Sequence, residues 1–126
     1  MRITGGSLKG RQILFLKNSN IRPTTDKTRS AIFSILGDIS NCSILDVCCG
    51  TGAFGIEAIS RGAKSATFID IDTENLKKNI DLIKGKEFNV IKGDFTKKIP
   101  LLINQLFDII FIDPPYEKYD LKMILD

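Results

Sequence analysis

Short apolar runs alternate with amphipathic stretches along the chain, which is the pattern of an α/β protein. Four runs have the length of a buried strand, at residues 43–47, 66–71, 89–92 and 108–112. Between them, apolar side chains recur at helical spacing, as in residues 74–84, where Leu76, Ile80 and Ile83 share one face. The alternation predicts a mostly parallel sheet with helices on both faces and right-handed crossovers.

Capping residues mark the ends of the other expected helices. Thr25 or Asp26 begins a helix that ends at Gly37. The helix after the strand at 43–47 is expected to end at residues 61–62, and a short helix is expected at 99–106. Four strands and their helices fit one domain within 126 residues.

Positive charge is concentrated in the first third of the chain. Residues 1–37 carry seven lysines and arginines against one acid, a net charge of +6, whereas residues 38–126 carry eleven against fourteen, a net charge of −3. Residues 1–20 predict a β-hairpin or two short strands outside the main fold. We therefore expect a basic arm with the first helix (1–37) that contacts a polyanion, ahead of a core at 38–126; the alternative is a solvated extension.

The composition excludes several kinds of site. No apolar run reaches the length of a membrane span and the N-terminus lacks a signal-peptide segment, so a cytoplasmic protein is expected. Cys42, Cys48 and Cys49 are odd in number and show no C-x-x-C spacing, which favours buried thiols over disulfides or zinc. The sequence contains no histidine, so histidine-based acid–base catalysis is excluded and no metal is expected.

A glycine turn after the strand at 43–47 predicts a ligand site. Gly50 and Gly52 allow a sharp turn and a close approach of the ligand to the backbone, and the N-terminus of the next helix faces the same place. Asp46 brings a carboxylate to the end of the strand, which favours a positively charged ligand over a pyrophosphate. Taken alone, such a segment is more often an ordinary tight turn.

Two further carboxylates follow the next strands. Asp70 lies eighteen residues after Gly52, where it can accept hydrogen bonds from both hydroxyls of an adenosine ribose. Asp94 can accept one from an adenine amino group, and Phe95 can pack on the ring. Each has a structural alternative, since the acids can cap helices and Phe95 can belong to the core. At the ends of consecutive parallel strands, however, they together predict a nucleoside pocket.

The last strand ends in Asp113-Pro114-Pro115-Tyr116. The prolines remove backbone donors and leave carbonyl acceptors. The Asp113 carboxylate and the Pro114 carbonyl can accept the hydrogens of an exocyclic amine on a nucleobase and direct its lone pair to an electrophile. Tyr116 can stack on the base. A proline-rich turn that closes a strand is the alternative, but the three upstream motifs favour the functional interpretation.

These motifs resemble the class I S-adenosylmethionine-dependent methyltransferases that modify amino groups. The class is indicated by Asp46-x-x-x-Gly50-x-Gly52, Asp70, Gly93-Asp94 and Asp113-Pro114-Pro115-Tyr116. A narrower resemblance, to the RsmD family, is carried by Arg2-Ile3-x-Gly5-Gly6, Gly10-Arg11, Arg22-Pro23-Thr24-Thr25-Asp26-x-x-Arg29 and Ser60-Arg61-Gly62-Ala63. Members of that family methylate N2 of a guanine in 16S ribosomal RNA, and the resemblance covers essentially the whole chain.

The resemblance implies a Rossmann-like methyltransferase fold and a division of labour within its site. S-adenosylmethionine would be held through its methionine part by Asp46, Gly50 and Gly52, through its ribose by Asp70, and through its adenine by Asp94 and Phe95. The guanine would be held by Asp113, Pro114 and Tyr116. At the position of Tyr116 the family more usually has a phenylalanine. RNA of the small ribosomal subunit would be contacted by Arg11, Arg22 and Arg29. The transfer would be an in-line displacement that needs no metal.

Two other functions compete with this interpretation. Gly50-x-Gly52-x-x-Gly55 formally fits a dinucleotide pattern, with Asp70 at a suitable distance, and so allows an NAD-dependent oxidoreductase. Asp46 beside a pyrophosphate would be unfavourable, however, and Asp113-Pro114-Pro115-Tyr116 would be unexplained. The second alternative is a catalytically impaired remnant that binds only cofactor or ribosomal RNA.

The number of strands supports that second alternative. The family's sheet has seven strands, and this sequence reaches the fourth. Residues 109–112 form a continuous apolar run, which suits a central strand buried on both faces. At the edge of a four-stranded sheet the run is expected to promote self-association, with weak or absent catalysis.

Overall fold

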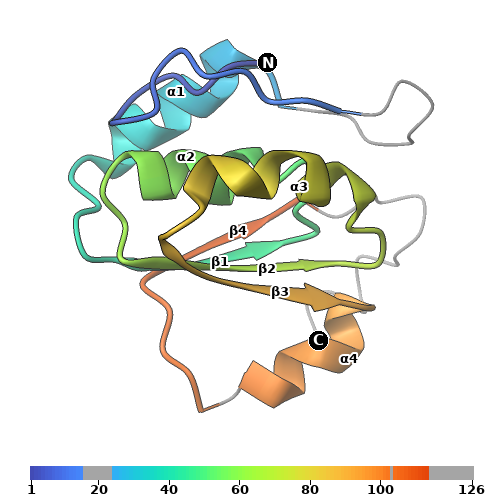
Figure 1. The fold of residues 1–126 in the computed structure, drawn as a ribbon. Helices are drawn as coiled ribbons and strands as arrows, with labels where there is room; N and C mark the ends of the chain where they lie inside the picture. Colours follow the sequence, from blue (N-terminus) through green and yellow to red (C-terminus); the bar gives the residue numbers. More distant parts are fainter. Residues whose placement is uncertain (16–23, 103, 114–126) are drawn as a thin grey trace.

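The computed structural model describes residues 1–15, 24–102 and 104–113 and contains a single parallel sheet with helices on both faces (Figure 1). Its elements in chain order are α1 (Asp26–Leu36), β1 (Ser43–Val47), α2 (Ala53–Ser60), β2 (Ser65–Asp70), α3 (Glu74–Asn79), η1 (Ile80–Ile83), β3 (Glu87–Lys92), α4 (Phe95–Lys98), η2 (Ile99–Leu102) and β4 (Ile109–Ile112). No helix within the described ranges is long and apolar enough to cross a membrane.

The sheet has the order β3-β2-β1-β4, and each neighbouring pair is parallel. In Figure 1, α2 and α3 cover one face, α1 and the N-terminal segment lie on the same side next to α2, and α4 lies on the opposite side. The order places β1 and β2 in the centre, so the turn after β1 lies in the middle of the carboxyl edge of the sheet. The predicted α/β fold is confirmed.

Side chains of β1 alternate between two hydrophobic clusters, one on each face of the sheet. Ile44 faces the cluster under α2, together with Phe33 and Phe68, whereas Leu45 and Val47 face the cluster that α4 covers. A strand buried on both faces reads as a continuous apolar run, which is why the pattern at 43–47 was sufficient to locate it.

The N-terminal residues form the predicted hairpin, but they join the main core. An antiparallel bridge pairs Arg2 with Gln12, and the Ile13 amide donates to the Met1 carbonyl at 2.8 Å. Ile3 and Ile13 are buried in the same cluster as the helices above the sheet. The hairpin therefore lies outside the sheet but not outside the hydrophobic core.

Gly5 and Gly6 attach the hairpin to the C-terminal end of α2. The Ser7 amide donates to the Ser60 carbonyl and the Leu8 amide to the Ser60 hydroxyl, both at 2.8 Å. A Cβ on Gly6, whose φ is 81°, would lie 2.0 Å from the Ser60 carbonyl oxygen. Two of the family-like motifs, one near residue 5 and one near residue 60, are thus the two sides of one backbone contact.

A buried ion pair connects α1 to α2. The Arg29 Nε lies 2.8 Å from Glu57 Oε1, and both side chains are fully buried. Glu57 also accepts hydrogen bonds from the Thr4 amide and hydroxyl and from the Arg61 guanidinium. Arg29 donates to the Arg2 carbonyl in the hairpin. The prediction that Arg29 contacts RNA is therefore wrong, because its charge is neutralised inside the protein.

Two of the expected helices differ from those observed. The helix expected at 99–106 begins earlier, as α4, because Asp94 caps it: Oδ1 accepts from the Thr96 amide at 2.9 Å. The helix expected at 74–84 divides into α3 and the 3₁₀ turn η1. The N-cap of α1 is Thr25, and Gly37 follows its last residue, as the sequence predicted.

Strand β4 occupies one edge of the described sheet. It pairs with β1 on one side, and its Ile110 and Ile112 side chains are 52% and 49% exposed. An exposed apolar edge strand favours pairing with another chain. Self-association through β4 stays a prediction.

Replacing Gly55 with alanine should destabilise the protein by about 1–3 kcal/mol, although alanine is the better helix former by about 1 kcal/mol. The reason is that a Cβ at this position in α2 would lie 2.3 Å from the buried Phe68 ring. Urea denaturation would measure the loss. Combining Gly55→Ala with Phe68→Leu should recover part of it, and additive losses in the double variant would contradict the clash.

Candidate active site

The carboxyl ends of the four strands bring the four predicted carboxylates to one place. Asp46 lies in β1 one residue before its end, Asp70 ends β2, and Asp94 and Asp113 follow β3 and β4. All four act on the thiol of Cys48 in the turn after β1: burial raises its pKa to about 12, and the charges of the four aspartates contribute to that rise. The thiol therefore stays protonated, and the potential at the turn is negative.

Asp46 is the most buried of these acids. Its side chain is buried, and its Oδ2 accepts a hydrogen bond from the Gly55 amide in the first turn of α2 at 3.1 Å. Burial raises its pKa to about 8; the Gly55 hydrogen bond opposes the shift, and the charges of Asp70 and Asp113 add to it. None of the ion pairs among the described residues involves Asp46, so a cationic ligand beside it would favour the ionised form that burial disfavours.

The turn after β1 is held in a conformation that favours glycine. Cys48, Gly50 and Gly52 have φ values of 57°, 55° and 84°. A non-glycine residue in this region is strained, and such strain is concentrated at ligand sites. A Cβ on Gly52 would lie 2.4 Å from a methyl group of Leu76, so the backbone packs closely against α3. The predicted need for glycine at 50 and 52 is explained.

Asp70 connects β2 to this turn. Its Oδ2 accepts from the Gly50 amide at 2.8 Å, and its Oδ1 accepts from the Asp72 amide at 3.3 Å. A pyrophosphate bound in the dinucleotide manner would need the Gly50 amide and would meet this carboxylate instead. The geometry thus opposes the oxidoreductase alternative. The half-buried Asp70 remains open to a ligand at the edge of the sheet.

Asp94 and Phe95, predicted to bind the adenine together, have different environments in the structure. Asp94 caps α4, and the hydrogen bonds from the Thr96 hydroxyl and amide lower its pKa. Phe95 is 4% exposed and packs with Leu45 and Leu102 on the lower face of the sheet. The predicted packing of Phe95 on an adenine ring is therefore wrong, and the core alternative holds. For Asp94 the capping alternative holds at Oδ1, which does not exclude a ligand at Oδ2.

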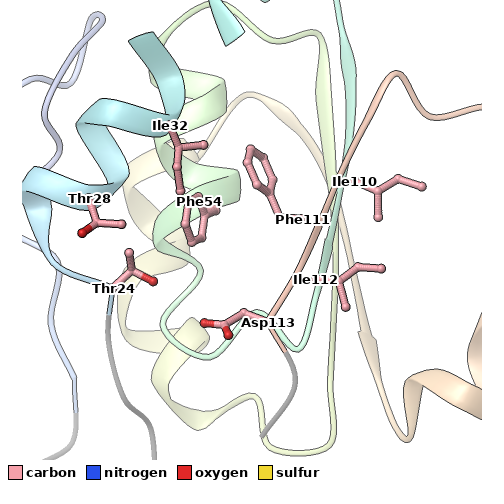
Figure 2. Close-up of a pocket in the computed structure, with 8 residues that line it drawn as sticks. All are labelled: Thr24, Thr28, Ile32, Phe54, Ile110, Phe111, Ile112 and Asp113. Atoms are coloured by element: carbon pink, nitrogen blue, oxygen red, sulfur yellow. The ribbon is translucent and has the colours of Figure 1, made fainter. Parts of the chain in front are cut away.

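Asp113 lies at the rim of a pocket between β4, α1 and α2 (Figure 2). The pocket has a volume of about 330 Å³ and is lined by Thr24, Thr28, Ile32, Phe54, Ile110, Phe111, Ile112 and Asp113. Figure 2 shows the Asp113 carboxylate pointing toward the Thr24 side of the pocket, below the Phe54 ring. The predicted partners Pro114 and Tyr116 lie outside the described residues.

Aromatic rings form the wall of this pocket. Phe54 stacks on Phe111 with ring centroids 4.7 Å apart and 22° between the planes, and Phe33 packs against Phe111 at 5.6 Å. Thr24 and Phe54 were not predicted as lining residues from the sequence. Phe54 stands two residues after Gly52, at the start of α2, and that position was the available signal. Thr24 carried no signal of this kind.

The structure describes two of the three arginines predicted to contact RNA, and these two differ in exposure. Arg11 is exposed in the hairpin, Arg29 is buried against Glu57, and Arg22 lies outside the described residues. Within the part of the chain that the structure describes, no group of three or more histidines, cysteines and acids has a metal-binding arrangement. The site thus offers carboxylates, backbone amides and aromatic rings to a ligand.

Comparisons with known proteins identify relatives of this chain. The family model described as Conserved hypothetical protein 95 matches residues 1–126. The chain is 40% identical to Ribosomal RNA small subunit methyltransferase D of Buchnera aphidicola, over 92% of this chain and 63% of the relative. It is 33% identical to the protein of the same name from Escherichia coli K12, over 94% of this chain and 61% of the relative.

A solved structure has the same fold. A hypothetical protein from Thermus thermophilus is 29% identical to the chain and superposes with a TM-score of 0.82, covering 99% of this chain and 77% of that one. The chain spans less than two thirds of the Buchnera and Escherichia relatives. Because the family model matches residues 1–126 and these relatives are 33% and 40% identical to this chain, the chain belongs to the RsmD family of Rossmann-like, S-adenosylmethionine-dependent methyltransferases.

Proposed function

We propose that the protein transfers a methyl group from S-adenosylmethionine to the exocyclic N2 of a guanine in small-subunit (16S) ribosomal RNA, in the cytoplasm. The observation that carries the proposal is the meeting of four strand-end carboxylates around the turn after β1. The names of the relatives, which act on small-subunit ribosomal RNA, support the class of substrate. The guanine follows from the resemblance of the motifs.

The residues present fit a cofactor that carries positive charge. Asp46 is a buried carboxylate that accepts a hydrogen bond from the Gly55 amide, and Asp70 and Asp113 increase the negative potential around it. The turn from Gly50 to Gly52 would hold the methionine part, and Asp70 would accept hydrogen bonds from the ribose. Asp94 would accept from the adenine through Oδ2. When bound, S-adenosylmethionine supplies an electrophilic methyl group on a sulfonium.

Asp113 would contact the amine of the substrate. An amine on a guanine ring is a weak nucleophile, because its lone pair is delocalised into the ring. The Asp113 carboxylate at the end of β4 can accept one of the amine hydrogens, and the Pro114 carbonyl can accept another. These hydrogen bonds favour a pyramidal nitrogen with its lone pair free for attack. Tyr116 would stack on the extruded base.

RNA contact is proposed for the hairpin side of the molecule. Arg11 is exposed there and Arg22 belongs to the same basic segment, so both could bind phosphates with an affinity that falls as salt is added. Arg29 contributes indirectly: it fastens the hairpin and the start of α1 to α2.

The affinity for S-adenosylhomocysteine, measured by calorimetry, tests the cofactor site. Asp70→Ala should weaken binding by about 1–3 kcal/mol, because it removes the acceptor for the ribose hydroxyls and releases the Gly50 amide. Asp72→Ala is the matched control, since it removes the same charge two residues away at an exposed position. Equal weakening by both variants would point to a general effect of charge instead of a contact.

Methyl transfer to small-subunit RNA or particles tests the reaction itself. Incorporation of label from S-adenosylmethionine at guanine N2 would support the full proposal. Cofactor binding without transfer would support the alternative of a catalytically impaired remnant. Wild-type protein that does not bind the cofactor would refute the proposed function.

A further inference from the structure

The pocket beside Asp113 has two polar groups that face each other. In Figure 2 the Thr24 hydroxyl and the Asp113 carboxylate point toward each other, with the Phe54 ring above them in this view. Thr28, in contrast, directs its methyl group toward Phe54 and its hydroxyl away. That hydroxyl accepts a hydrogen bond from the Thr25 hydroxyl at 2.9 Å. Two neighbouring threonines thus present different groups to one pocket.

Thr24 is held in place from inside the protein. Its carbonyl oxygen accepts a hydrogen bond from Nη1 of the buried Arg29 at 3.3 Å, and Thr25, the next residue, caps α1. Arg29 in turn is bound to Glu57 of α2. The position of the Thr24 side chain is therefore set by the same network that attaches α1 to α2, opposite the end of β4.

The shape and chemistry of the pocket fit a planar base with polar edges. Phe54 and Phe111 provide apolar ring surface, and the volume of about 330 Å³ lies at the small end of the usual range for ligand sites. The Asp113 carboxylate repels anions and accepts hydrogen bonds, so the occupant must carry a donor such as an amine. A lipid chain would leave both polar groups unpaired, at a cost.

We propose that Thr24 is a substrate-binding residue. Its hydroxyl contacts the ring edge of a purine base, and Asp113 holds the exocyclic amine of the same base. The inference rests on the proposed function and deepens it, because it assigns base recognition to the segment before α1. In guanine the N2 amine lies between a ring N–H and a ring acceptor nitrogen. A threonine hydroxyl can either accept from the first or donate to the second.

Binding of guanosine to the full chain, with S-adenosylhomocysteine present, tests the inference by NMR titration. In the wild type, the Thr24 methyl and Phe54 ring signals should shift together and reach saturation. Thr24→Val should weaken guanosine binding about five- to tenfold, because it keeps the shape and removes one hydrogen bond. Thr24→Ser should restore binding to within about twofold of the wild type. Thr28→Val is the control, and it should stay within about twofold, because its hydroxyl lies outside the pocket.

Two further readouts separate this inference from the proposed function. All of these variants should bind S-adenosylhomocysteine like the wild type, and Thr24→Val should raise the KM for RNA in methyl transfer. Loss of guanosine binding in Thr28→Val as large as in Thr24→Val, or no saturable shift in the wild type, would overturn the role of Thr24. If the wild type binds cofactor and methylates RNA while Thr24→Val does so equally well, only the role of Thr24 is refuted.

Discussion

Replacing Glu57 with glutamine is expected to lower the free energy of unfolding by about 3–5 kcal/mol, a large part of the total for a small domain. Glu57 is fully buried and accepts hydrogen bonds from Arg29, Arg61 and Thr4. Glutamine keeps the shape but leaves the buried guanidinium of Arg29 without its main counter-charge. Urea denaturation of both proteins would measure the difference. Hydrogen exchange at the Thr4 amide, which donates to Glu57, would show whether the hairpin detaches.

Glu74→Gln is the matched control. The Glu74 carboxylate lies 3.5 Å from the Lys77 ammonium, and both side chains are 62% exposed, so the pair is screened by water and should contribute less than about 1 kcal/mol. Similar losses in Glu57→Gln and Glu74→Gln would show that the buried pair is not what fastens the hairpin. A variant with apolar replacements of both Arg29 and Glu57 should be more stable than Glu57→Gln, because no charge is left buried.

The free energy of unfolding of the wild type should fall as pH rises toward 8. The part of this fall that comes from Asp46 should be absent in Asp46→Asn. Burial raises the pKa of Asp46 to about 8, above its ordinary value of 3.8, so between these values the native state holds a proton that the unfolded state releases. The carboxyl stabilises the fold below the unfolded pKa, and this contribution is lost as pH rises through the folded pKa, by about 1.4 kcal/mol per pH unit. Asparagine is neutral at every pH and can still accept from the Gly55 amide.

Urea denaturation at several pH values would measure this difference. The stability gained by Asp46→Asn should be about 4 kcal/mol larger at pH 8 than at pH 5. Asp38→Asn is the control: hydrogen bonds from Ser40 lower the pKa of that exposed carboxyl, so its influence is confined to acid pH. Parallel curves for the wild type and Asp46→Asn would show that Asp46 is already ionised. Asp46→Asn should also lose affinity for S-adenosylhomocysteine, because the substitution that stabilises the fold removes a carboxylate from the proposed cofactor site.

The two buried acids respond to pH in opposite directions. Burial opposes ionisation of Glu57 as well, but hydrogen bonds from Thr4 and Arg29 outweigh it and lower the pKa of that carboxyl. Its contribution is present above its ordinary pKa of 4.5 and is lost as pH falls through the lowered value. Glu57 has cationic partners within the protein, whereas no ion pair among the described residues involves Asp46.

Much of the fold could be predicted from local patterns. The strands of a parallel sheet are buried on both faces and therefore appear as continuous apolar runs, and Thr25 and Gly37 are strong helix boundaries. The carboxyl ends of parallel strands meet by necessity, which is why Asp46, Asp70 and Asp113 could be grouped without a structure. The start of α4 was missed because Asp94 was assigned to a ligand, although a carboxylate at that place also makes a good cap.

Long-range burial was not predictable in the same way. Arg29 lies in a basic segment and has the sequence features of a phosphate contact, and only the position of Glu57, 28 residues away, shows that it is an internal counter-ion. Phe95 follows a strand and could face either a ligand or the core, and the side of the sheet that α4 covers decided the outcome. Thr24 became a candidate only when the fold placed α1 opposite the end of β4.

The attachment of the hairpin to α2 also bears on the order in which the protein can fold during synthesis. Thr4 and Leu8 are synthesised before their partners, Arg61 and Ser60, which follow 57 and 52 positions later. Until α2 has emerged, Ile3 and Ile13 have no core to enter, and the hairpin alone is too small to be stable in water. The hairpin is therefore synthesised before α2 but fixed only after α2 has formed, so it stays open to chaperones and proteases while the sheet is assembled.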